Sequence, residues 1–215
     1  MGRRTRVQSE KTPTAPTRIQ AENRQRLIAA ALTVFSRAGY EGATVDALAE
    51  AAGMSKPNLL YYYPTKEALY RAALDSVLEG WLEPLAAISA EGEPLEEIAR
   101  YIARKLAMSA ANPTASRLFA GEVMRGAPVL GALLAGPLRQ LVDEKAAVIA
   151  GWAADGRIRP VEPRHLIFAI WATTQHYADF DAQVRAVLGP EASGRRFEDA
   201  GETLATLFLQ GLAPR

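Results

Sequence analysis

Cysteine is absent from this chain of 215 residues, and histidine occurs only twice. Without cysteine there can be no disulfide framework, no thiolate nucleophile and no thiolate metal ligand. His165 and His176 could combine with Asp179 and Glu122 in a mixed ligand set. Two histidines are few for such a site, and a structural or pocket role suits them better. We therefore expect no metal.

Long apolar runs are also missing, since none approaches the roughly eighteen residues of a membrane span. The run from Leu27 to Phe35 follows an arginine-rich segment and could pass for the core of a signal peptide. Its amphipathic period, however, continues through Ala38 to Gly39, which favours the first helix of a bundle. The sequence thus predicts a cytoplasmic protein with no membrane partner.

Patterns typical of sheets and enzymes are lacking as well. Apolar residues nowhere alternate with polar ones as in strands, and we find no phosphate loop, nucleophile elbow, suitably spaced carboxylate pair or cofactor fingerprint. These absences predict an all-α protein that is not an enzyme and binds no cofactor. A helical enzyme and a helical interaction protein without DNA affinity are the alternatives from other classes.

What the chain does contain is an uneven distribution of charge. Apolar residues make up 49% and charged residues 23%, as in globular proteins. The net charge of +1 combines +5 over residues 1–71, from 11 Lys+Arg and 6 Asp+Glu, with −4 over residues 72–215. A basic front and an acidic rear fit a DNA-facing end joined to an end for ligand binding or dimerisation.

The most informative segment begins at Thr44, a suitable N-cap for a short helix. Ala47, Leu48 and Ala51 have the spacing of a buried helix side. Gly53 can adopt the left-handed conformation that ends such a helix. The segment therefore predicts a short helix followed by a tight turn.

A second short helix follows, with Ser55 as its cap, Pro57 in its first turn and Pro64 at its end. Two short helices joined by a glycine turn form the motif that places one helix in a major groove, although an ordinary hairpin is the alternative. Asn58 can pair with an adenine edge, while tyrosine hydroxyls and lysines commonly reach phosphates. The candidate DNA-binding residues are Thr44, Ser55, Lys56, Asn58, Tyr61, Tyr62 and Lys66.

The remaining periodicity predicts about nine helices in two domains. We expect a disordered basic arm over 1–19, a three-helix helix-turn-helix domain over 20–66, and a larger helical domain for ligand binding and dimerisation over 67–215. The arm either solubilises the chain or strengthens DNA binding by counterion release. Outside the two short helices, the expected helices are 20–38, 65–83, 94–111, 114–125, 128–154, 162–188 and 195–212.

A ligand contact is suggested by the segment from His165 to Phe180. On a helix, Phe168, Trp171 and Gln175 share one side, because they lie three and four positions apart. A planar heterocycle can stack on an indole, and a carboxamide offers one donor and one acceptor to an imide edge. The alternative is that both aromatic residues are core and the amide is bonded internally.

The 44–70 segment resembles the DNA-reading part of the TetR family of bacterial repressors. Pro57 and Leu60 replace the glycine and tyrosine usual in the family, so base preferences cannot be transferred. The resemblance implies a homodimer, formed through contacts of the last two helices, that binds a near-palindromic double-stranded operator, mostly as a repressor. The matching residues are Thr44, Ala49, Ala52, Gly53, Ser55, Leu59, Tyr62, Lys66, Glu67 and Leu69.

Residues 24–188 are further similar to members of this family that regulate pyrimidine utilisation, most specifically in the stretch WATTQHYADF from Trp171. This resemblance implies uracil or a related pyrimidine as the effector. The pocket residues that it carries over are Trp81, Trp171 and Gln175, to which we add Arg117 and Phe119. The alternative is a regulator of the same fold that responds to a different, more hydrophobic effector.

Overall fold

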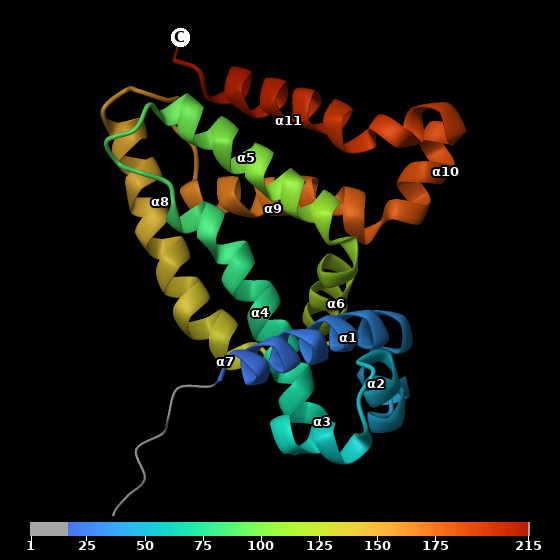
Figure 1. The fold of residues 1–215 in the computed structure, drawn as a ribbon. Coiled ribbons are helices and arrows are strands. Elements are labelled where there is room, and N and C mark those ends of the chain that lie inside the picture. Colours follow the sequence, from blue (N-terminus) through green and yellow to red (C-terminus); the bar gives the residue numbers. More distant parts are fainter. Residues whose placement is uncertain (1–16, 215) are drawn as a thin grey trace, which may run out of the picture.

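The computed structural model describes residues 17–214, which fold into helices without a strand (Figure 1). This confirms the all-α class, with a small helical front and a larger helical rear. The helices are α1 (Arg18–Gly42), α2 (Val45–Ala51), α3 (Lys56–Tyr62), α4 (Lys66–Ala86), α5 (Pro94–Ala111), α6 (Pro113–Met124), α7 (Gly131–Leu133), the π-helical turn η1 (Leu134–Leu138), α8 (Arg139–Ala154), α9 (Pro163–Asp179), α10 (Asp181–Ala192), the 3-10 turn η2 (Ser193–Arg195) and α11 (Arg196–Leu212).

The first helix begins earlier than the sequence suggested. Thr17 caps α1, since its side chain accepts a hydrogen bond from the Gln20 backbone and the Gln20 side chain accepts one from the Thr17 backbone. This reciprocal capping fixes the start at Arg18. The last two residues of the expected arm, 18 and 19, are therefore helical, whereas 1–16 lie outside the described residues.

The DNA-binding end shares its core with the rear of the molecule. In Figure 1, α1 lies across α4 and α6. Leu27 and Phe35 of α1 belong to one buried cluster with Tyr70 of α4 and Leu118 of α6. Because packed cores transmit displacement, a shift of α4 or α6 also displaces α1.

Two of the long predicted helices are broken, which raises the number of α-helical segments in residues 17–214 from the expected nine to eleven. The helix expected over 128–154 contains η1, where Pro137 lacks the N–H of a regular turn. The helix expected over 162–188 ends at Asp179. The expected end of the fourth helix at residue 83 was also wrong, because α4 continues to Ala86 with Pro84 buried in its last turn.

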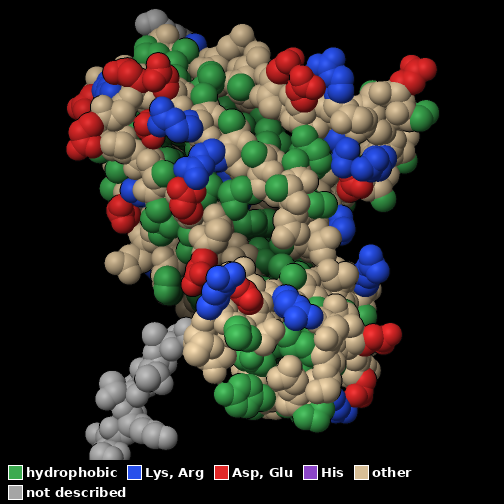
Figure 2. Space-filling view, in the orientation of Figure 1, with side chains coloured by type: hydrophobic (Ala, Val, Ile, Leu, Met, Phe, Trp, Pro, Cys, Tyr) green, Lys and Arg blue, Asp and Glu red, His purple; other side chains and the backbone are tan. Residues whose placement is uncertain are grey.

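The rear helices surround α5, which runs between α9 and α11 (Figure 1). A second buried cluster fills this part, including Tyr101 and Ile102 of α5 and Ile170 of α9. In Figure 2, charged side chains of both signs are interspersed over the visible face, with hydrophobic side chains showing between them down its middle. None of the helices in residues 17–214 has both the length and the apolar character to span a membrane.

Candidate functional site

The turn between α2 and α3 has the expected geometry. Gly53 has φ +61°, and the Met54 backbone N–H donates to the carbonyl of Ala49 over 2.9 Å. The Arg26 guanidinium donates to the Ala52 carbonyl over 2.9 Å, which ties the turn to α1. The position of α3 is thus fixed by the left-handed glycine and by an anchor from another helix.

The outer side of α3 is polar and available to a nucleic acid. Lys56, Asn58 and Tyr61 are exposed, Tyr61 to 71%, whereas Leu59 is buried on the opposite side. Lys56 forms an exposed ion pair with Asp46 over 3.0 Å. An exposed pair of this kind contributes little stability, so a phosphate can compete for the lysine.

Thr44 and Ser55 cap the two short helices. The Thr44 hydroxyl oxygen accepts from the Ala47 backbone over 3.1 Å, and that of Ser55 accepts from the Asn58 backbone over 3.4 Å. Both side chains belong to exposed residues. Each hydroxyl keeps its own O–H as a donor, and can therefore contact a phosphate while capping its helix.

Tyr62 and Lys66 have contacts within the protein that the sequence did not reveal. The Tyr62 hydroxyl accepts from the Asn23 side chain over 2.9 Å. The Lys66 ammonium donates to the carbonyls of Tyr40 and Ala43 over 2.8 and 3.0 Å, and lies 4.4 Å from the centre of the Tyr40 ring. Lys66 therefore links the start of α4 to the end of α1, which is a structural role.

These contacts predict the effect of replacing Lys66 with methionine. The two carbonyls lose a charged donor, so the free energy of unfolding should fall by about 1–3 kcal/mol. The salt dependence of DNA binding should stay unchanged, whereas loss of a phosphate contact lowers its slope by about one unit. Urea unfolding and DNA titrations at several salt concentrations measure both, with Lys56→Met as control. Unchanged stability with a reduced slope would contradict the structural role.

Four of the six predicted ligand residues meet around one small cavity of about 40 Å³. Trp81 comes from α4, Phe119 from α6, and Trp171 and Gln175 from α9. The Trp81 and Phe119 rings lie 5.3 Å apart, centre to centre. The full lining is Leu78, Trp81, Leu82, Lys105, Phe119, Leu138, Trp171 and Gln175.

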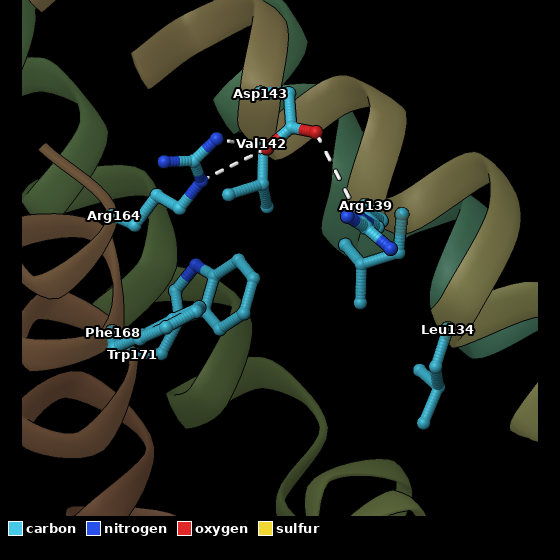
Figure 3. A pocket seen from close by; sticks show the side chains of 8 residues that line it. Leu134, Arg139, Val142, Asp143, Arg164, Phe168 and Trp171 are labelled. Atoms are coloured by element: carbon cyan, nitrogen blue, oxygen red, sulfur yellow. Dashed lines mark hydrogen bonds and ion pairs between the residues drawn. The ribbon is translucent and has the colours of Figure 1, made fainter.

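The other two predicted ligand residues lie elsewhere. Phe168 lines an outer hollow of about 530 Å³ that shares Leu138 and Trp171 with the cavity. Figure 3 shows this hollow, with Phe168 and Trp171 below Asp143, to which the Arg164 and Arg139 side chains extend. Arg117 is exposed and donates to the Ala178 carbonyl over 3.3 Å. The structure does not bring Arg117 to the cavity.

The indole of Trp171 is held in place from α5. Its Nε1 donates to the Tyr101 hydroxyl over 2.5 Å. Burial raises the pKa of Tyr101, against the lowering effect of this hydrogen bond, so the phenol stays protonated. The Trp171 ring therefore forms a fixed wall between the cavity and the outer hollow.

Sequence analysis missed Lys105, which lines the cavity from α5 and is only 3% exposed. Its ammonium lies 4.4 Å from the centre of the Trp81 ring. Burial lowers the pKa of Lys105 to about 8, opposed by the negative charge of Asp179. The available signal was its position: Lys105 falls on the apolar side of α5, three and four positions from Ile102 and Tyr101.

Asp179, at the end of α9, connects α9 to α6. Its carboxylate accepts a hydrogen bond from the Ser116 hydroxyl. Burial raises the pKa of Asp179, against that hydrogen bond and the positive charges of Arg117, Lys105 and His176. Within residues 17–214 no three His, Asp or Glu side chains gather as a metal site would require.

Comparisons with known proteins agree with this arrangement. Residues 27–73 match the family described as bacterial regulatory proteins, tetR family, and residues 74–215 match the C-terminal region of YcdC-like proteins. The HTH-type transcriptional regulators RutR of Escherichia coli (strain K12) and Shigella flexneri are each 45% identical over 206 residues, covering 95% of this chain and 97% of theirs.

Solved structures show the same fold. A tetR-family regulatory protein from Rhodococcus RHA1 superposes with a TM-score of 0.71 at 20% identity, covering 90% of this chain and 98% of that one. Together with the sequence matches, this makes the chain a DNA-binding transcriptional regulator and not an enzyme. The chain belongs to the TetR family of bacterial transcriptional regulators and resembles RutR.

Proposed function

We propose that this regulator is a homodimeric repressor of pyrimidine-metabolism genes, which uracil or a related pyrimidine releases from its operator. The observation that carries the proposal is the cavity between α4 and α9, where two indoles and the carboxamide of Gln175 face one space. The resemblance of the segment from Trp171 to regulators of pyrimidine utilisation supports the same effector class.

The chemistry of the lining suits a flat, uncharged ring. Trp81 and Trp171 offer aromatic faces, and Gln175 offers one donor and one acceptor to an imide edge. A site that pairs those edges rejects ligands that leave its polar groups unpaired. Cytosine reverses the donor pattern at one edge and should bind poorly. Thymine adds only a methyl group, so its discrimination should be modest.

The size of the cavity suggests how binding is coupled to DNA release. A water molecule needs about 10–15 Å³ of such space, so 40 Å³ holds only a few waters and no pyrimidine ring. Entry of the effector must therefore displace Trp81, Phe119 or Leu138. Trp81 is on α4, which begins three residues after α3. Displacement of Trp81 therefore moves α4, which is joined to the DNA-binding helices by a short segment.

Operator binding needs two copies of α3 about 34–36 Å apart, as successive major grooves require. The family resemblance places the dimer contacts on the expected helices 162–188 and 195–212, which correspond to α9 with the first part of α10 and to α11. Leu207 of α11 is 65% exposed, whereas Leu204 is buried within the chain. Of the apolar stripe expected for this contact, Phe197, Leu204, Leu207 and Phe208, the side chain of Leu204 packs into the core of its own chain, so Leu207 is the member most available to a partner. By linkage, operator binding must weaken effector binding by the same factor.

Replacement of Asn58 by alanine should weaken specific operator binding by about 1–3 kcal/mol, because its exposed carboxamide can pair with one adenine. The stability of the fold should stay unchanged, since the Asn58 side chain is on the exposed side of α3. Gel-shift titrations with operator and with unrelated DNA give the two affinities. Equal operator affinity of wild type and variant excludes this base contact.

A second candidate function uses the outer hollow. Its volume of about 530 Å³ and the apolar part of its lining, Leu134, Leu138, Val142 and Phe168, favour a larger, more hydrophobic effector, which would lie beside the charged side chains of Arg139, Asp143 and Arg164. A thermal-shift panel that compares pyrimidines with drug-like and acyl compounds separates the two. Stabilisation by uracil, with a dissociation constant confirmed by calorimetry, supports the pyrimidine. Stabilisation only by the hydrophobic compounds supports the alternative.

A further inference from the structure

Lys105 is only 3% exposed and lines the cavity, and within residues 17–214 its ammonium lies over the face of Trp81 without an ion pair to a carboxylate. Asp179 is the carboxylate whose charge acts on it, yet their charged atoms do not form an ion pair and Asp179 accepts its hydrogen bond from Ser116. The face of Trp81 attracts the ammonium, but gives it no acceptor. Burial of an ammonium group without an acceptor or a paired charge lowers the stability of the fold, unless a bound ligand supplies the acceptor.

The other buried lysine, Lys145, differs from Lys105 because it has partners within the fold. Lys145 of α8 donates to the Ile88 carbonyl over 3.1 Å and pairs with Glu144 over 2.9 Å. Its charge is therefore compensated within the fold. Lys105 points instead into the cavity, among Trp81, Trp171 and Gln175.

We infer that Lys105 recognises a carbonyl oxygen of the effector. This inference rests on the proposed function and deepens it, because it names the chemical group that the site requires. Lys105 is on α5 and Gln175 on α9, so the two approach the cavity from different helices. A ring bound between them can be held at one acceptor oxygen by the ammonium and at its imide edge by the carboxamide.

The ligand class follows from these two contacts. The cavity selects flat heterocycles that carry a ring carbonyl in addition to an imide-type N–H and carbonyl pair. Replacement of the recognised oxygen by sulfur weakens the hydrogen bond, since sulfur is a poor acceptor. The energetic gain is that of a charged hydrogen bond in a water-poor site, which is larger than that of a neutral one.

The test compares Lys105→Met with wild type in calorimetric titrations of uracil, 2-thiouracil and 4-thiouracil. Uracil affinity should fall roughly 10- to 100-fold in the variant. Wild type should discriminate against both thio-analogues, and K105M should lose the discrimination against one of them. The melting temperature of K105M should not fall, because the substitution removes an uncompensated buried charge.

Lys145→Met is the matched control, since it removes a buried lysine that already has partners. It should lower the melting temperature and leave uracil affinity unchanged. Uracil affinity of K105M within twofold of wild type overturns the inference, and so does an equal loss for all three ligands. Failure of wild type to bind any of the three overturns the proposed function instead, so the two failures are distinguishable.

Discussion

Replacing Glu122 with alanine is expected to lower the free energy of unfolding by about 3–5 kcal/mol, the largest stability effect we predict. Glu122 is fully buried at the end of α6. Its carboxylate accepts hydrogen bonds from the backbone N–H groups of Val129 and Leu130 over 2.7 and 3.3 Å. It also accepts from the Tyr70 hydroxyl over 2.9 Å and from Arg125 over 3.3 Å. Alanine leaves the two backbone N–H groups and the Tyr70 hydroxyl without this acceptor, whereas Arg125 still donates to the Tyr70 oxygen over 2.8 Å.

Glu122 lies where the DNA-binding end meets the rear helices, so its replacement should also affect how the two parts are connected. Tyr70 is on α4, and the backbone donors belong to the segment that leads from α6 to α7. That segment contains Ala127 with φ +54°, a strained conformation for a residue with a side chain. The Glu122 carboxylate therefore holds α4, α6 and a strained turn together at the joint between the DNA-binding end and the rear helices.

Urea unfolding of Glu122→Ala and Glu122→Gln measures this prediction. Glutamine retains a carbonyl oxygen that can accept from Val129 and Leu130, so its loss should be clearly smaller than that of alanine. A loss below about 1 kcal/mol for E122A is incompatible with a carboxylate that satisfies four donors. A loss as large in E122Q as in E122A would show that the charge, and not the accepted hydrogen bonds, provides the stability.

Replacing Gln175 with leucine should abolish the response to uracil and leave operator binding intact. The substitution keeps the side-chain volume but removes the donor and the acceptor that face the cavity. Uracil then has an unpaired imide edge, and its affinity should fall by about 2–4 kcal/mol, which is roughly 30- to 700-fold. Operator affinity should not change, because Gln175 is on α9, in the rear of the molecule (Figure 1).

Calorimetry gives the uracil affinity of the variant, and gel shifts give its operator affinity. Gln140→Leu is a suitable control, since Gln140 is an exposed glutamine of α8 outside the cavity lining. The control should respond to uracil as wild type does. Unchanged uracil affinity of Q175L would show that Gln175 does not contact the effector. Loss of operator affinity would show that Gln175 has a structural role instead.

Local signals in the sequence predicted the DNA-binding motif well. Gly53 required a left-handed turn, and Thr44 and Ser55 were recognisable caps, because these features depend on neighbouring residues only. The partners of Lys66 could not be found in the same way. They lie 23 and 26 positions away in the chain, so only the folded arrangement of α1 and α4 brings them together.

The cavity between α4 and α9 was predictable in part. Helical periodicity places Trp171 and Gln175 one turn apart, and the family resemblance supplied Trp81. Periodicity puts Lys105 on the apolar side of α5, but it could not show that Lys105 lines this cavity or that Arg117 lies outside it, since both depend on how α5 and α6 pack against α9. Periodicity also did not show the break after α9, where the backbone of Phe180, with φ −110° and ψ 30°, leaves the helical region between Asp179 and Asp181.

We propose that a pyrimidine bound in the rear cavity releases the regulator from its DNA. The most direct test of this proposal adds micromolar uracil to the purified protein bound to the DNA upstream of its own gene, and follows the complex by gel shift. We predict that wild type dissociates and that the Gln175→Leu variant stays bound. A wild-type complex that persists at saturating uracil would contradict the account.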